Sequence, residues 1–260
     1  MYLTSQLQIP VPAEPLCRGL HLTTLPRITM IDLNLLAAIL KEGKLELEPL
    51  LTQEEQARLA GFTYPKRHLE WLGGRLAAKA ALAKLSAEPF NPLAWQVVNA
   101  PDGRPRFLRS DGATAGQSIE LSISHSDGLA TAVVDHHPLG LDIQKITPAV
   151  MRVREKFCTP LEETRLLALN TFSEPVAALT LLWAAKEALR KALGGHPLTG
   201  FLAMELTGGE PLGEQALIVQ LTTITRTPSF IHRVLTFLHL DYGCAVAVIN
   251  RDTPWNSSNS

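Results

Sequence analysis

The order in which helical and strand-like patterns follow one another is the feature that most constrains the fold. Apolar residues recur at helical spacing between residues 30 and 85, and strand-like segments follow between 95 and 135. The same order then returns, with helical patterns over 148–193 and strand-like patterns over 203–249. Helices followed by strands, twice over, predict an α+β chain built from two similar halves. No residue-level repeat between the halves is evident, so their similarity is expected only in structure.

Individual residues indicate where elements begin and where they are interrupted. Met30–Lys41 has helical spacing, and Thr52 with Glu55 at the third helical position resembles a capping box. Gly73 and Gly74 interrupt the next predicted helix at a cost of about 1 kcal/mol each, which implies a packing or ligand reason for them. The expected divisions of the chain are an N-terminal α+β half over residues 1–138, a C-terminal α+β half over 139–250 and a polar tail over 251–260.

Composition excludes several classes of protein. The chain has 24 Lys and Arg against 25 Asp and Glu, which argues against a dedicated nucleic-acid binder. Apolar runs fall short of the ~20 residues that span a bilayer, so no membrane insertion is expected. Cys17, Cys158 and Cys244 are far apart and odd in number, which favours buried thiols over a disulfide framework or a metal knuckle. These features predict a cytoplasmic protein.

The first part of the chain whose residue types suit ligand binding or catalysis comprises Leu121–Ser126 and Gly140–Gln144. Hydroxyl groups, amides and the His125 imidazole suit a phosphate-bearing ligand, because they donate hydrogen bonds to phosphate oxygens. Asp142 and Gln144 are two positions apart on a predicted strand, so both face one side and could serve a hard cation such as Mg²⁺. The alternative is a structural histidine and an aspartate that only forms a salt bridge.

A second stretch is Trp183–Gly194, which is predicted to be helical. Trp183, Glu187 and Lys191 recur at i, i+4 and i+8 along one face of that helix. The alternative interpretation is a solvated Glu–Lys pair beside an aromatic core contact, worth about 0.3–0.5 kcal/mol.

Together these motifs resemble the signature of the 4′-phosphopantetheinyl transferase superfamily, and most closely its single-chain, surfactin-type branch. The resembling segments are Ile123-Ser124-His125-Ser126, Gly140-Leu141-Asp142-Ile143 and the Trp-x-x-Lys-Glu-x-x-x-Lys run that begins at Trp183. Asp102-Gly103-Arg104-Pro105 is similar to the family's Gly-Lys-Pro turn, Phe157–Glu162 to the element between its two signatures, and Tyr242–Val248 to its closing strand. The resemblance covers about residues 51–248.

The resemblance implies a fold, an activity and a set of partners. The fold would be two similar α+β halves, a pseudo-dimer in one chain, with coenzyme A in the cleft between them. The enzyme would transfer 4′-phosphopantetheine from coenzyme A to a serine of an apo acyl or peptidyl carrier protein, and release 3′,5′-ADP. A monomer would suffice, since both halves lie in one chain.

The resemblance also implies roles in the chemistry. Asp142 and Glu187 would hold Mg²⁺ on the pyrophosphate of coenzyme A, and Glu187 would accept the proton of the carrier serine. Lys191 would stabilise charge on the transferring phosphoryl group. Lys186 lies about 100° round the helix from Glu187 and is given at most a supporting role.

Four further residues match positions that bind the phosphates of coenzyme A: Arg58, Arg104, Ser124 and His125. The chain departs from the family at Gln144, where many surfactin-type enzymes have a glutamate. Gln144 keeps an oxygen as a possible metal ligand but carries no charge, which weakens the expected hold on Mg²⁺ before coenzyme A arrives.

The sequence also bears on two other functions. A non-catalytic module that binds coenzyme A or a carrier protein is favoured by Gln144 alone. A serine hydrolase using Ser124 or Ser126 with His125 is disfavoured, because neighbouring strand residues face opposite sides and the chain lacks a Gly-x-Ser-x-Gly elbow.

Overall fold

The computed structural model divides the chain into two compact units, each of which combines helices with β-sheet. The N-terminal unit holds residues 26–136 together with the segment ending at Val11, and the C-terminal unit begins at His137. The predicted α+β class is confirmed. The structure describes residues 6–11, 26–86, 89–111, 119–169, 172, 174–194, 200–223 and 230–249, so the tail over 251–260 and Cys17 lie outside the described residues.

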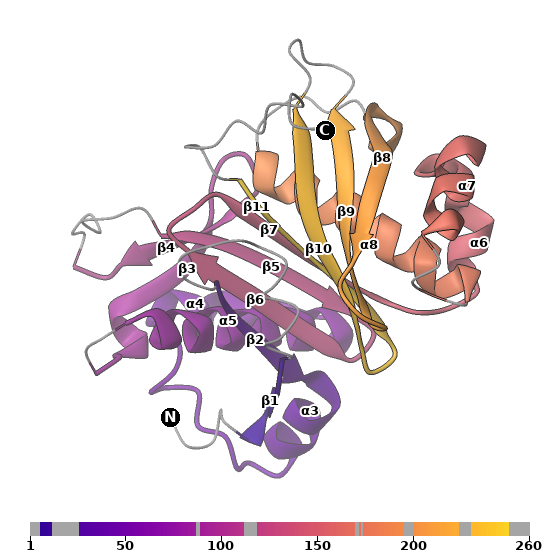
Figure 1. Ribbon diagram of the computed structural model, residues 1–260. Helices are drawn as coiled ribbons and strands as arrows, with labels where there is room; N and C mark the ends of the chain where they lie inside the picture. The colour runs from indigo at the N-terminus through magenta and orange to yellow at the C-terminus, as the bar shows by residue number, and fades with distance from the viewer. Residues whose placement is uncertain are drawn as a thin grey trace. The chain divides into compact units, whose positions relative to one another are not determined.

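The N-terminal unit places one long helix on an antiparallel sheet (Figure 1). Its sheet has the order β1-β2-β6-β5, α5 packs along β2, β5 and β6, and β3 and β4 form a separate hairpin. The elements are β1 (Gln8–Ile9), β2 (Arg27–Asp32), α3 (Leu33–Lys41), α4 (Gln53–Ala60), α5 (Pro65–Leu85), β3 (Trp95–Asn99), β4 (Pro105–Arg109), β5 (Glu120–Ser126) and β6 (Leu129–Asp135).

The C-terminal unit repeats this arrangement with a larger sheet (Figure 1). The sheet has the order β7-β11-β10-β9-β8, and α8 lies along β7, β11 and β10. The elements are β7 (Leu139–Lys145), α6 (Ala149–Val153), α7 (Pro160–Ala168), α8 (Pro175–Leu193), β8 (Met204–Pro211), β9 (Ala216–Thr223), β10 (Ile231–His239) and β11 (Tyr242–Val248).

The two glycines of α5 have a packing reason. A Cβ atom on Gly73 would collide with Leu33, and one on Gly74 would lie 3.0 Å from Ile123 Cγ2. Small residues here let α5 approach β5 closely, and the favourable free energy of this packing offsets their low helix propensity.

The prediction that a helix begins at Met30 is wrong, because residues 30–32 belong to β2. The run Ile28-Thr29-Met30-Ile31 is buried in the sheet, and the helix begins only at Leu33. Asp32 is the N-cap, and its carboxylate accepts hydrogen bonds from Asn34 N (2.8 Å) and Leu35 N (3.0 Å). β-branched residues before an aspartate cap favour this division.

The expectation that the halves share no residue-level repeat is also wrong. Thr52 and Glu55 form the predicted capping box at α4, and Thr159 and Glu162 form the equivalent box at α7. In each unit this glutamate pairs with a buried lysine 24 residues later, Lys79 on α5 or Lys186 on α8. The surrounding helix sequences are Ala-Ala-Lys-Ala-Ala-Leu-Ala-Lys in α5 and Ala-Ala-Lys-Glu-Ala-Leu-Arg-Lys in α8.

Two of the three cysteines are described, and both are buried and unpaired, as predicted. Burial raises the pKa of Cys158 to about 11 and raises that of Cys244 further. Among the described helices, none is long and apolar enough to cross a bilayer.

Candidate active site

Asp142 lies in the middle of β7, on the face that α8 covers. Its Cα is paired with that of Ala245 on β11, and its side chain is buried. Two positions earlier, a Cβ atom on Gly140 would collide with the backbone of α8 at Ala188. The glycine therefore allows α8 to approach the strand closely, which brings the helix side chains within reach of the Asp142 carboxylate.

The structure brings Asp142, Lys191 and Gln144 together. Lys191 Nζ lies 2.8 Å from Asp142 Oδ1 and also donates to Leu141 O at 2.9 Å. Gln144 Nε2 donates to Asp142 Oδ2 at 2.8 Å, so the two strand residues face one side as predicted. A buried carboxylate with a cation on one oxygen and an amide on the other is held in a single orientation.

Glu187 lies one helical turn before Lys191 on α8. Its carboxylate is mostly buried, with a side-chain exposure of 15%, and accepts from Arg190 Nη2 at 2.7 Å and Arg190 Nε at 3.1 Å. Arg190 itself is half exposed, so the pair is open to solvent on one side. Glu187 and Asp142 both belong to the packed surface between α8 and β7.

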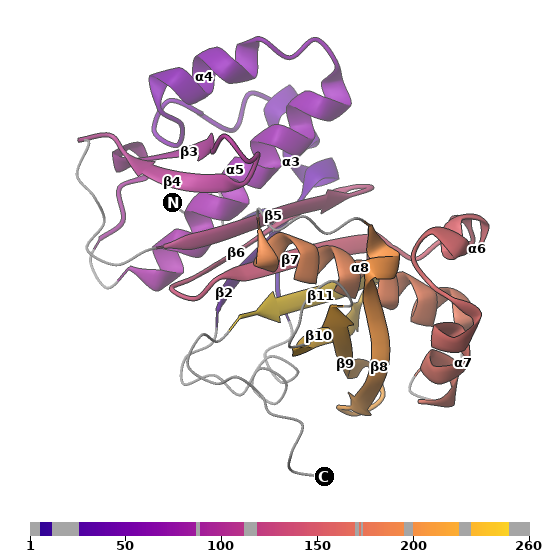
Figure 2. The same cartoon turned by 90° about the horizontal axis from the view of Figure 1, so that it is seen from above.

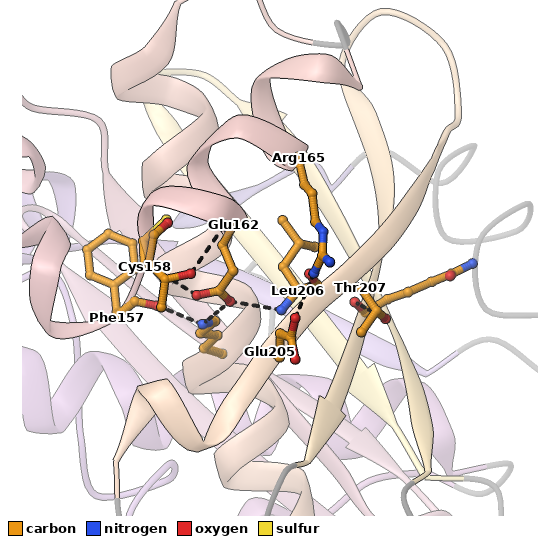
Figure 3. Close-up of polar contacts among 10 residues, drawn as sticks. Phe157, Cys158, Glu162, Arg165, Glu205, Leu206 and Thr207 are labelled. Carbon is orange, nitrogen blue, oxygen red and sulfur yellow. Dashed lines mark hydrogen bonds and ion pairs between the residues drawn. The ribbon is translucent and has the colours of Figure 1, made fainter.

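Lys186, the neighbour of Glu187, takes no part in this cluster. Its side chain is fully buried and donates to Phe157 O and to Glu162 Oε1, both at 2.6 Å (Figure 3). Glu162 Oε1 also accepts from Leu206 N at 2.8 Å, and its Oε2 accepts from Thr159 N. Burial lowers the pKa of Lys186, against the opposing effect of Glu162. This network joins α7, α8 and β8 and has a structural role.

The other predicted residues all lie in the N-terminal unit. Ser124 is buried on β5, and the next residue, His125, is half exposed with Nδ1 3.6 Å from Glu70 Oε1 on α5. Arg58 is exposed on α4, with its guanidinium 5.6 Å from the centre of the Phe62 ring. Arg104 follows the β3 strand and donates to Asp102 Oδ2 at 2.7 Å.

Sequence reasoning missed two features of these sites. Glu70, which faces His125, has no motif of its own and becomes visible only when α5 packs on β5. The role of Glu162 was detectable, because its capping box and its spacing to Lys186 match those of Glu55 and Lys79.

The carboxylates of Asp142 and Glu187 are of the kind that would suit a magnesium ion. Carboxylate oxygens are the ligands that Mg²⁺ prefers, and it usually binds through one or two carboxylates together with water and substrate phosphates. The described residues contain no cluster of three acidic, histidine or cysteine side chains that could hold a metal ion by themselves. Gln144 turns its amide nitrogen toward Asp142 here, which makes it a support for that carboxylate.

Comparison with known proteins places this cluster in a recognised family. Residues 138–247 match the model of the 4′-phosphopantetheinyl transferase superfamily. A holo-[acyl-carrier-protein] synthase of Geobacillus kaustophilus is 35% identical over 127 residues, which are 47% of this chain and 92% of that protein. The chain belongs to the 4′-phosphopantetheinyl transferase superfamily. The match with that relative covers less than half of this chain, because the relative is much shorter.

For longer members of the superfamily, the alignment with this chain covers a smaller share of the relative's length. The 4′-phosphopantetheinyl transferase psf-1 of Bacillus pumilus is 24% identical over 161 residues, 61% of this chain and 65% of that protein. The transferase gsp of Aneurinibacillus migulanus is 30% identical over 101 residues, which span 42% of its length. A crystal structure of a Bacillus anthracis holo-(acyl-carrier-protein) synthase in complex with coenzyme A (3′,5′-ADP) is 29% identical, with a TM-score of 0.36, over 42% of this chain and 91% of that one.

Proposed function

We propose that this protein transfers the 4′-phosphopantetheine arm of coenzyme A to a serine of an apo carrier protein and releases 3′,5′-ADP. The observation that carries the proposal is the buried Asp142–Lys191 pair beside Glu187, inside the segment that matches the transferase model. The names of the relatives, holo-acyl-carrier-protein synthase and phosphopantetheinyl transferase, support the same reaction.

Each residue of the cluster has a role that its chemistry allows. Asp142 and Glu187 would hold Mg²⁺, which when bound neutralises charge on the phosphates of the substrate. The carboxylate of Glu187 accepts the proton of the attacking serine hydroxyl, directly or through water. The ammonium group of Lys191 stabilises the negative charge on the transferring phosphoryl group. The oxygen of the serine forms a new bond to phosphorus as the bond to the ADP oxygen breaks.

The hydrogen bonds that Glu187 and Asp142 accept within the chain hold their carboxylates in place before the substrate binds. Arg190 donates to the Glu187 carboxylate, and Gln144 donates to one oxygen of Asp142. A carboxylate held before the substrate binds loses less conformational freedom in the reaction, which is the benefit of preorganisation.

The proposal is tested with the full chain and a panel of apo carrier proteins. Incubation with coenzyme A and Mg²⁺ should add the mass of one phosphopantetheine arm to at least one carrier. Glu187→Gln should remove this mass gain and keep the circular dichroism spectrum, whereas Glu174→Gln, an exposed glutamate at the start of the same helix, should leave it unchanged. Tight binding of coenzyme A with no mass gain on any carrier contradicts the transferase assignment.

A second function, a module that binds coenzyme A or a carrier protein without transfer, is favoured by Gln144. The neutral amide removes one negative charge from the metal site, and a binding module has no need for that charge. Such a module would hold coenzyme A with the same affinity whether or not Mg²⁺ is present, which calorimetry measures directly. Placement in the cytoplasm and a monomeric state remain predictions.

A further inference from the structure

The ion pair between Glu187 and Arg190 belongs to one copy of the repeat only. Aligned through the buried Glu–Lys pairs, α5 has Ala80 in the place of Glu187 and Ala83 in the place of Arg190. α5 packs on its sheet with these two alanines, so neither charge is required for a helix at this point of the fold. The acid and its arginine are therefore a joint feature of the unit that carries the candidate active site.

Arg190 holds only one of the two carboxylate oxygens of Glu187. Its Nε and Nη2 atoms both donate to Glu187 Oε2, at 3.1 and 2.7 Å. Within the described part of the chain, Glu187 Oε1 accepts no hydrogen bond. The strongest arginine–carboxylate pairs use the planar fork on both oxygens. The contact seen here gives up part of that strength, and it fixes the carboxylate with Oε1 available for another group.

A row of aromatic rings holds the guanidinium group of Arg190. The group lies 5.5 Å from the centre of the Phe201 ring, in the short 3₁₀ helix Phe201–Ala203 before β8. The Trp183 ring is 5.4 Å from that of Phe201 and 4.8 Å from that of Phe157, which is fully buried. A cation is attracted to the face of an aromatic ring, so Phe201 limits the positions that the half-exposed arginine adopts.

The N-terminal unit lacks this aromatic row as well as the ion pair. Leu76 stands in the place of Trp183, and Pro92, the first residue of the 3₁₀ helix before β3, stands in the place of Phe201. The rings and the ion pair are thus present together in one unit and absent together from the other. The buried Glu–Lys pair on the same helices is common to both units, so it does not depend on them.

The neighbouring lysine has a different acid as its partner. α8 lies along β7, and Lys191 on this helix pairs with Asp142 on the strand (Figure 2). Consecutive residues of α8 therefore supply one cation to each acid of the candidate site. Loss of Arg190 would act on Glu187 and would leave the Asp142–Lys191 pair in place.

We propose that Arg190, anchored on Phe201, is a positioning residue that selects the oxygen of Glu187 used in the transfer. The inference rests on the proposed function, in which Glu187 accepts the proton of the carrier serine. With Oε2 bound by Arg190, this proton passes to Oε1 as the serine oxygen bonds to phosphorus and 3′,5′-ADP leaves. A carboxylate fixed in one orientation loses less rotational freedom in the transition state, which raises kcat without tightening either substrate.

The first test measures kcat and KM of the full chain with coenzyme A, Mg²⁺ and an apo carrier protein. Arg190→Ala, which introduces the residue found at this place in α5, should lower kcat about 10- to 100-fold and change either KM less than about threefold. Guanidinium ion should restore part of the lost kcat, because the position is half exposed, whereas urea should not. Arg233→Ala, which breaks another arginine–glutamate pair of this unit, is the matched control and should change neither constant.

Two further variants test the anchor and the fork. Phe201→Leu should also lower kcat, and the double variant Arg190→Ala, Phe201→Leu should lose no more than Arg190→Ala alone, because the ring acts through the arginine. Losses that multiply in the double variant overturn the inference. Arg190→Lys keeps the charge without the planar fork and should lower kcat several-fold with both KM values unchanged. It decides the matter should the alanine variant not fold.

An unchanged kcat in Arg190→Ala overturns the inference, as does a rise in the KM for the carrier alone, since Arg190 would then contact the carrier. A second measurement needs no transfer. By NMR, the Nε hydrogen of Arg190 should exchange with solvent more slowly than that of the exposed Arg27, and Phe201→Leu should speed this exchange several-fold. Rapid exchange in the natural chain overturns the inference, whereas slow exchange with no modified carrier contradicts the transferase proposal.

Discussion

At the scale of single residues, the position of a side chain around α8 decides its role. Lys186 and Glu187 are adjacent in sequence, yet Lys186 forms a buried structural ion pair with Glu162 whereas Glu187 pairs with Arg190. The repeat supports this division. The N-terminal unit keeps the lysine, as Lys79, although it has Ala80 in place of Glu187. Because the N-terminal unit has this lysine without the adjacent acid, the lysine has a structural role in both units.

Gln144→Glu should strengthen metal binding at the candidate site. In the absence of metal the new carboxylate faces Asp142, where the amide nitrogen now donates, so the variant should have a lower Tm than the natural chain. With Mg²⁺ present, the third acid should lower the concentration required for half-maximal transfer several-fold. A titration of activity and of Tm with Mg²⁺ measures both effects. An unchanged magnesium requirement would place Gln144 outside the metal shell.

Cys158→Ala should change how stability depends on alkaline pH. The folded chain holds the pKa of Cys158 at about 11, raised from an ordinary value near 9.0, chiefly by burial. Between these values the unfolded chain releases the thiol proton and the folded chain keeps it, so stability falls as pH rises. The contribution is full below pH 9 and declines by about 2–3 kcal/mol toward pH 11.

Urea unfolding of both proteins from pH 8 to pH 11 measures this contribution. Their difference in unfolding free energy should be constant up to about pH 9 and should then shift in favour of the alanine variant. Other groups titrate in this range, but they are common to both proteins. A constant difference across the whole range would show that Cys158 keeps an ordinary pKa.

At the scale of elements, the buried Glu–Lys pairs connect each long helix to the rest of its unit. Lys186 joins α8 to the start of α7, and Glu162 joins both to β8 through Leu206 N. Lys79 joins α5 to α4 in the same way, and Glu55 accepts from Val97 N on β3. Each carboxylate oxygen and each ammonium group of these pairs has at least one hydrogen-bond partner, as desolvated charges require.

Lys186→Met should destabilise the chain by about 3–5 kcal/mol, because it leaves the Glu162 carboxylate buried without its cation. The double variant Lys186→Met, Glu162→Leu should recover part of this loss, since both charges are then absent. Urea unfolding gives the three free energies. A double variant less stable than the single one would show that the hydrogen bonds of Glu162 to Thr159 N and Leu206 N outweigh the cost of its unpaired charge.

Elements were predictable where a local signal marks them. The Thr52–Glu55 capping box gave the start of α4, and the Ala- and Leu-rich run gave α5. β2 was missed at Met30, because a short apolar run before a helix has no period of its own and is recognised only once β6 pairs with it. The Asp142–Lys191 contact could not be predicted from the sequence for the same reason, since it depends on how closely α8 approaches β7 at Gly140.

At the scale of the whole molecule, the repeat extends from the helices to the sheets. Lys84 Nζ donates to Ile28 O on β2 at 3.1 Å, as Lys191 Nζ donates to Leu141 O on β7. Thr29 is paired with Ala132, as Asp142 is paired with Ala245. The N-terminal unit therefore keeps the lysine of the candidate active site and has Thr29 and Ala80 where the other unit has its two acids.

Restoring these acids should create a second metal site. Thr29 is buried, and its hydroxyl oxygen has no hydrogen-bond partner among the described residues, so an aspartate there would meet Lys84 as Asp142 meets Lys191. In an Asp142→Asn background, which removes one acid of the candidate metal site, Thr29→Asp with Ala80→Glu should give binding of one Mn²⁺ by calorimetry. Thr29→Asp alone is the control and should bind none, because one carboxylate is a poor site. A folded double variant that binds no Mn²⁺ would show that the two units share their backbone and their lysines but differ in the spacing of helix and strand on which the acidic site depends.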